Sequence, residues 1–119
     1  MKTKQKSTAI PFDEIRLKYL RDPKEAQYAV KLALDEFEKD NDVEALLDTL
    51  RLAAQAQGGL AKLARKASVS RQALHGALSP EGNPRLRTFQ NVLGGLGLRM
   101  TIKPATGKSG RNLAMAKLV

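Results

Sequence analysis

Apolar residues recur every three or four positions in five successive segments of the chain, which is the spacing of helices with one buried face. Asp22 precedes Pro23, and Glu25 follows three positions after Asp22, a pattern of N-cap, first-turn proline and capping-box acid. It predicts a helix over 22–40, and capping residues and a paired glycine bound a second helix over 41–57. Because aromatic residues make up only 4% of the chain and Trp is absent, Leu, Ala and Val must fill the core. The sequence therefore predicts an all-α fold.

Two short helices joined by a tight turn form a helix-turn-helix pattern at about residues 60–78. Ala64 is the small residue where the first helix packs on the second, and Leu74 is the apolar anchor midway along the second. Ser70 is the expected N-cap of that helix. Ser68 stands in the turn where glycine is commonest, and a serine accepts modest strain in a left-handed conformation.

The pattern then predicts a turn-rich loop, a fifth helix at 88–96 and a short strand at 98–103. The strand has alternating apolar residues and ends at a proline, which cannot donate to a sheet. The whole sequence is thus divided into three parts: a basic N-terminal arm at 1–21, a helical domain at 22–103 and a basic C-terminal tail at 104–119.

Charge is segregated along the chain. The 119 residues carry 21 Lys and Arg against 12 Asp and Glu, for a net charge of +9. Residues 1–21 hold six bases and two acids, residues 22–50 three and nine, and residues 51–119 twelve and one. The basic segment, with Glu81 as its single acid, favours binding of a polyanion, because released counterions drive such association. A basic surface that serves solubility alone is the alternative.

The second helix of the 60–78 unit begins with side chains suited to base edges in the DNA major groove. Arg71 suits guanine and Gln72 suits adenine, while His75, one turn further along, either faces the groove or merely covers the helix. Contacts to the DNA backbone would set register without reading sequence. The residues predicted to make them are Ser70, Lys62, Arg65, Lys66, Arg85 and Arg87.

Residues 63–84 match the pattern LAxxxxxSRxxLxxxLSxxGNP, and an apolar helix and a Leu-Gly-Leu turn follow. Residues 22 to about 103 thereby resemble the addiction-module antidote (antitoxin) proteins of the HigA-like group, most specifically in the loop Leu-Ser-Pro-Glu-Gly-Asn-Pro. The resemblance implies a Cro/lambda-repressor-like fold with a Cro/C1-type helix-turn-helix, and a dimer. It also implies repression of its own operon and neutralisation of a RelE/ParE-like, HigB-type toxin. Such proteins act in the cytoplasm and are bacterial or prophage-encoded.

The acidic segment is the candidate surface for the toxin. The resemblance implies a toxin that is a ribosome-dependent ribonuclease, and such an enzyme must be basic to bind RNA. Acidic side chains on the antitoxin would be complementary to it and speed association. The residues assigned to this contact are Tyr28, Asp35, Glu36 and Glu38. Tyr19 and Leu20 are further apolar positions expected to be exposed. An ordinary solvated helix face is the alternative for the acids.

A homodimer is expected, because one short recognition helix reads too few bases. The helix at 88–96 and the strand at 98–103 are the candidates for its interface. With no cysteine, a single histidine and no glycine-rich phosphate loop, we expect neither an enzyme nor a cofactor or metal. No apolar run reaches the roughly 18 residues of a membrane span.

Two other functions stay open from the sequence. The first is a stand-alone phage-type transcriptional repressor, which would use the same DNA site without a protein partner. The second is a nonspecific basic protein that binds RNA or packages a chromosome, with affinity that depends on salt and hardly on sequence.

Overall fold

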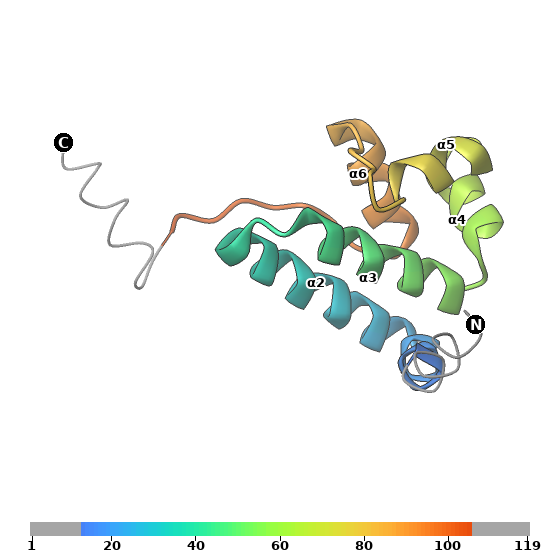
Figure 1. Cartoon of the computed structure of the whole chain (residues 1–119), viewed down its shortest axis with the longest axis horizontal. Helices are drawn as coiled ribbons and strands as arrows, with labels where there is room; N and C mark the ends of the chain where they lie inside the picture. Colours follow the sequence, from blue (N-terminus) through green and yellow to red (C-terminus); the bar gives the residue numbers. More distant parts are fainter. Residues whose placement is uncertain (1–12, 106–119) are drawn as a thin grey trace, which may run out of the picture.

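A computed structural model describes residues 13–105, and all regular secondary structure in this part of the chain is helical. Its helices are α2 (Pro23–Asp40), α3 (Val43–Ala56), α4 (Leu60–Ala67), α5 (Arg71–Ala77) and α6 (Leu86–Gly95), and residues 13–20 are helical as well. Figure 1 shows α2 and α3 as a long antiparallel pair, with the three shorter helices gathered on one side of it. None of the helices in residues 13–105 has the length and apolar character needed to cross a membrane.

The long pair forms where the capping residues predict it. Asp22 accepts a hydrogen bond from the Lys24 amide at 3.0 Å, and Pro23 opens α2. Asn41 ends α2 in the left-handed conformation, with φ 61°. Asp42 then caps α3 by accepting from the Ala45 amide at 3.1 Å. The chain thus reverses direction within two residues, which sets α2 antiparallel to α3.

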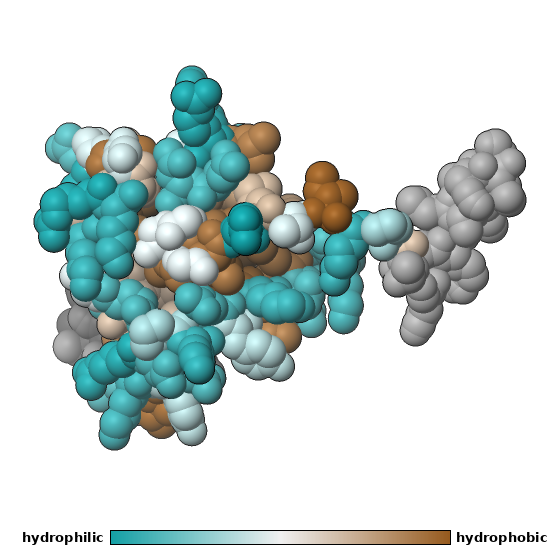
Figure 2. Space-filling view, turned by 180° about the vertical axis from the view of Figure 1, so that it is seen from behind, coloured by the Kyte–Doolittle hydropathy of each residue, from teal (hydrophilic) through white to brown (hydrophobic). Residues whose placement is uncertain are grey.

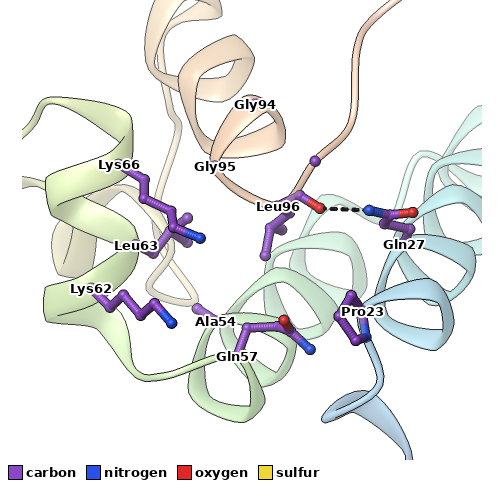
Figure 3. Close-up of a pocket in the computed structure, with 11 residues that line it drawn as sticks. Pro23, Gln27, Ala54, Gln57, Lys62, Leu63, Lys66, Gly94, Gly95 and Leu96 are labelled. Atoms are coloured by element: carbon purple, nitrogen blue, oxygen red, sulfur yellow. Dashed lines mark hydrogen bonds between the residues drawn. The ribbon is translucent and has the colours of Figure 1, made fainter.

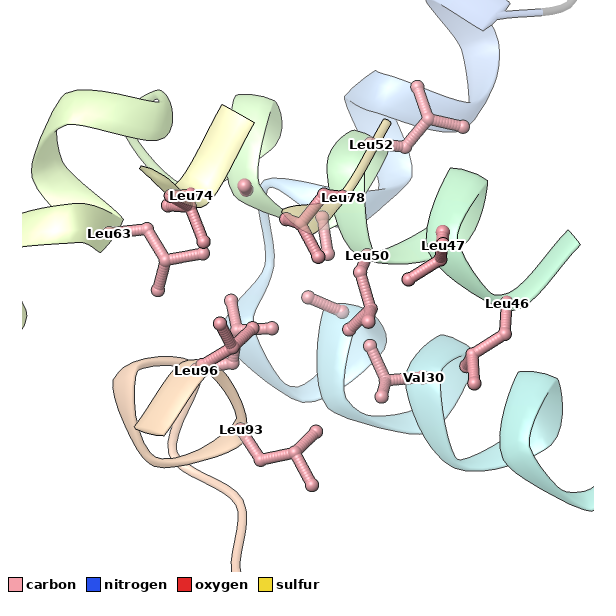
Figure 4. Packing of buried hydrophobic residues seen from close by; sticks show 14 of the residues in the cluster. Val30, Leu46, Leu47, Leu50, Leu52, Leu63, Leu74, Leu78, Leu93 and Leu96 are labelled. Carbon is pink, nitrogen blue, oxygen red and sulfur yellow. The ribbon is translucent and has the colours of Figure 1, made fainter. Parts of the chain in front are cut away.

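One continuous core joins the long pair to the shorter helices. Figure 4 shows Val30 of α2 and leucines of α3, α4 and α5 pointing into the same space. Burial of a side chain of this size contributes about 1.5–3 kcal/mol. The largest fully buried side chains are Leu47, Leu50, Leu74, Leu78, Val30 and Val92. They come from both groups of helices, so the two groups share one core.

Two glycines shape the region around α6. A Cβ at Gly95 would lie 2.5 Å from Leu63 Cδ1, so the absence of a side chain lets α6 approach α4 closely. Gly97 adopts φ 86°, and the next amide, of Leu98, bonds to the Leu93 carbonyl at 2.8 Å. This is the usual glycine ending of a helix, and the residue after it, Leu98, still packs against the core.

The prediction of a strand at 98–103 is wrong. Residues 98–105 have no regular secondary structure, and Ile102 is 96% exposed. A strand needs a second strand to pair with its amides, and residues 13–105 contain none. The alternation of apolar residues therefore finds no partner within this part of the chain.

The structure also corrects the expectation for Leu20. This residue is 6% exposed and belongs to the core, because residues 13–20 are helical and pack it there. Gln57 of the turn after α3 donates to the Leu20 carbonyl at 2.6 Å and to the Arg21 carbonyl at 2.9 Å. Residues 1–12 and 106–119, which hold the rest of the predicted arm and most of the tail, lie outside the described residues.

Candidate functional site

Helices α4 and α5 are joined by a three-residue turn with the conformation that the sequence predicts. Ser68 is left-handed, with φ 59° and ψ 40°, and its amide bonds to the Arg65 carbonyl at 3.2 Å. Ser70 caps α5, because its Oγ accepts from the Ala73 amide at 2.9 Å. Ala64 and Leu74 are both buried where the two helices meet the core. The turn thereby holds α5 at a defined angle to α4.

The outer face of α5 carries the residues predicted to read base edges. Arg71 and Gln72 occupy its first two positions, and His75 lies one turn after Arg71 on the same side. All three are exposed, whereas Leu74 between them points into the core. The structure thus brings this predicted set together on one helix.

The residues predicted to contact the DNA backbone do not form one cluster. Lys62 and Lys66 of α4 line an open cleft of about 530 Å³ beside Gly94 and Gly95, at the carboxyl end of α6. Figure 3 shows both lysines pointing toward that cleft, across which Gln27 of α2 bonds to the Leu96 carbonyl at 3.1 Å.

Arg85 and Arg87 lie at the opposite end of α6. Arg85 is the N-cap residue, and Arg87 lies in the first turn. Because α6 has ten residues, the two ends of the helix are about 15 Å apart. The predicted backbone set therefore divides into an α6 N-terminal pair and a cleft pair, while exposed Arg65 lies on α4 and Ser70 caps α5.

The amino ends of α4, α5 and α6 have no acidic side chain that would balance their positive charge. No acidic residue occupies the first turn of α4, α5 or α6, whereas arginines stand at the amino ends of α5 and α6. The amino end of a helix is itself positive, so a basic residue there is locally unfavourable and an anion is favoured. Within residues 13–105, every ion pair lies between residues 13 and 51. The basic side chains of 62–103 thus have no acidic partner in this part of the chain.

The residues predicted to contact a protein partner lie on α2 but face different directions. At 100° per residue, Asp35 is about 20° from Tyr28 around the helix, whereas Glu36 and Glu38 are each about 80° away on opposite sides. Asp35 pairs with Lys31 at 3.4 Å. Glu36 similarly approaches a lysine of its own helix, so α2 neutralises part of its own acidity.

Leu32 is a surface residue that the sequence prediction did not include. It is 44% exposed and lies one turn after Tyr28, which is 59% exposed. Both lie on the side of α2 opposite buried Ala26 and Val30. The spacing of four residues between Tyr28 and Leu32 is the signal that could have identified the pair. Figure 2 shows one face of the molecule, on which hydrophobic areas interrupt a mainly hydrophilic surface.

Comparison with known proteins covers most of the described chain. A family model described as "Probable addiction module antidote protein" matches residues 14–104. An uncharacterized protein of Haemophilus influenzae is 32% identical over 74 residues, which are 62% of this chain and 75% of that protein. No solved structure matches the chain significantly. The family match includes the helical residues 14–20, which the predicted domain of 22–103 leaves out.

Proposed function

The chain belongs to the family of probable addiction module antidote proteins, and from this premise we propose an antitoxin that also binds its own operator DNA and represses its operon. The observation that carries the DNA-binding part is the exposed face of α5 with Arg71, Gln72 and His75. It stands on a serine-capped helix in a region whose basic side chains lack acidic partners within residues 13–105. These are the requirements of a surface that binds a polyanion and reads it.

In this proposal α4 and α5 form a Cro/C1-type helix-turn-helix, and α5 enters the major groove. An α-helix with its side chains is about 10–12 Å across, which suits the roughly 12 Å width of that groove. Ser70, Arg65, Arg85 and Arg87 would contact phosphates, where Arg85 and Arg87 add their charge to the positive end of α6. Lys62 and Lys66 are weaker candidates for phosphate contact, because they line the cleft at the other end of α6.

The proposal includes a homodimer, because a single short recognition helix covers too few base pairs. Residues 88–96 and 98–103 are the proposed interface. Met100 and Ile102 are exposed apolar residues on the irregular segment after α6, and a second copy would cover them. The molar mass in solution, measured by sedimentation equilibrium, tests this part.

The toxin part of the proposal assigns a RelE/ParE-like, HigB-type partner to the outer face of α2. Tyr28 and Leu32 would supply apolar contact, and Asp35, Glu36 and Glu38 would attract a basic protein. The role is one of binding without catalysis, in the cytoplasm. Co-purification of the tagged chain with the product of the adjacent reading frame tests this part. Failure to find a partner would favour the stand-alone repressor.

The decisive experiment for DNA binding is a fluorescence-anisotropy titration against the upstream DNA and a scrambled duplex, at about 50 and 200 mM salt. We expect a preference of about 1,000-fold for the upstream DNA. Replacement of Arg71 and Gln72 by Ala should remove that preference, whereas Lys31→Ala on α2, which removes the same charge, should keep it. Equal affinity of the unmodified chain for both duplexes would contradict autoregulation and favour a nonspecific nucleic-acid-binding protein.

A further inference from the structure

Arg51 connects α3 to the carboxyl end of α5. Its Nη1 donates a hydrogen bond to the carbonyl of Leu78, the residue that ends α5, and its Nη2 lies 3.0 Å from Asp48 Oδ1. The Arg51 side chain is 27% exposed, and Leu78 is fully buried. The sequence prediction treated Arg51 only as one of twelve bases, because the carbonyl that it reaches is 27 positions further along the chain.

Helix α5 needs an attachment of this kind. It has seven residues, of which only Leu74 is fully buried, and helices this short are marginal on their own. Its packing is mainly against α4. The last carbonyls of any helix lack partners within the helix, and a cation at that end also suits the helix dipole. Arg51 supplies both a donor and a charge, so α5 is held at its amino end by Ser70 and at its carboxyl end by α3.

The position of Arg51 is itself fixed by neighbours. Asp48 contacts Arg51 on one side and Arg16 of the helical residues 13–20 on the other, with 3.7 Å between Arg16 Nη1 and Asp48 Oδ2. A guanidinium presents its donors in a rigid planar fork, so one arginine can hold a carboxylate and a carbonyl at the same time. A lysine at this position would lack that fixed geometry.

We propose that Arg51 is a positioning residue for α5, which sets how Arg71 and Gln72 are presented and thereby sequence discrimination. This inference rests on the proposed DNA-binding function of α5. Loss of the Arg51 contact leaves a buried carbonyl without its donor and frees the end of α5, while the core contact of Leu74 remains. The helix would then stay folded but lose its defined orientation.

The test compares Arg51→Met, which keeps an apolar stem without donors, with Arg51→Lys and with Arg21→Met. Arg21 is exposed in the turn before α2, so Arg21→Met removes the same charge away from α5. The readouts are amide hydrogen exchange in α5 relative to α3 and the ratio of affinities for upstream and scrambled DNA. For Arg51→Met we expect exchange in α5 to rise about tenfold and the affinity ratio to fall about tenfold, the size of one hydrogen bond to a charged group. Arg51→Lys should be intermediate, and Arg21→Met should leave both readouts unchanged.

Three results would overturn the inference. The first is that amide exchange in α5 is as slow in Arg51→Met as in the unmodified chain. The second is that exchange in α5 of this variant is faster but its ratio of affinities for upstream and scrambled DNA is unchanged. The third is an equal rise of exchange in α3 and α5, because Arg51 would then stabilise the whole domain and not the orientation of α5. If the unmodified chain shows no preference for its upstream DNA, the proposed function fails instead, and exchange in α5 still decides whether Arg51 holds that helix.

Discussion

The α2–α3 pair and the group formed by α4, α5 and α6 share one core but carry opposite charges at the amino ends of their helices. Both α2 and α3 begin with an aspartate cap and carry a glutamate in the first turn, which suits the positive end of a helix. The three shorter helices have no acid in their first turns, and α5 and α6 begin with arginines. Local stability explains the charges of the pair. The charges of the shorter helices oppose local preference, which is typical of residues retained for binding.

The largest expected effect is the loss of unfolding free energy when a buried leucine is shortened in either region, and it tests whether the two regions unfold as a single cooperative unit. Leu74→Ala in α5 and Leu47→Ala in α3 each remove a fully buried leucine, which costs about 2–5 kcal/mol of unfolding free energy. Urea unfolding can be followed by far-UV circular dichroism and by tyrosine fluorescence, since Tyr28 lies on α2 and Tyr19 lies in the helical residues just before it, outside the group of shorter helices. The two signals should coincide in each variant. Separate transitions would mean that the regions unfold independently.

The second prediction concerns the uncompensated bases. Replacement of Arg85 and Arg87 by Ala should weaken binding to every duplex about equally, and the slope of log affinity against log salt should flatten by about 1.8. Replacement of Lys31 and Lys39 by Ala changes the net charge equally but in the acidic region, and should leave that slope unchanged. A loss confined to the upstream DNA would contradict a phosphate role for the arginines.

The third prediction concerns the acids of α2. Conversion of Asp35, Glu36 and Glu38 to their amides should slow association with a basic toxin about tenfold at low salt, because long-range attraction raises association rates. Stopped-flow measurements at two salt concentrations would show the difference shrinking as salt rises. Upstream-DNA binding should not weaken. An unchanged association rate at low salt would mean that the partner binds elsewhere.

The smallest expected effect is on the unfolding free energy of glycine variants at the two left-handed residues, Ser68 and Asn41, one in each region. Ser68→Gly should raise the unfolding free energy by up to about 1 kcal/mol, because glycine has no Cβ to strain the turn. Asn41→Gly should gain less, since asparagine tolerates this conformation better than serine. Thermal unfolding of both variants measures the difference. A larger gain at Asn41 would contradict the strain assigned to the turn between α4 and α5.

The parts of the site that the sequence predicted are those with local causes. The left-handed Ser68, the capping Ser70 and the exposed Arg71 each depend on neighbours within about four residues, so spacing alone identifies them. The separation of Lys62 and Lys66 from Arg85 and Arg87 was not predictable in this way. It depends on how α6 packs against α4, which the periodicity of either helix does not specify.

The sequence by itself determined the helical class, the caps of α2 and α3, the turn before α5 and the segregation of charge, because all of these arise from adjacent residues. Only the tertiary structure decided that Leu20 is buried, that residues 98–103 have no strand to pair with inside residues 13–105, and that Arg51 reaches α5. Gln27 and Leu96 are bonded across 69 positions of sequence. Contacts at such separations form only when several helices pack together, because each pairing depends on the shapes and positions of all the others.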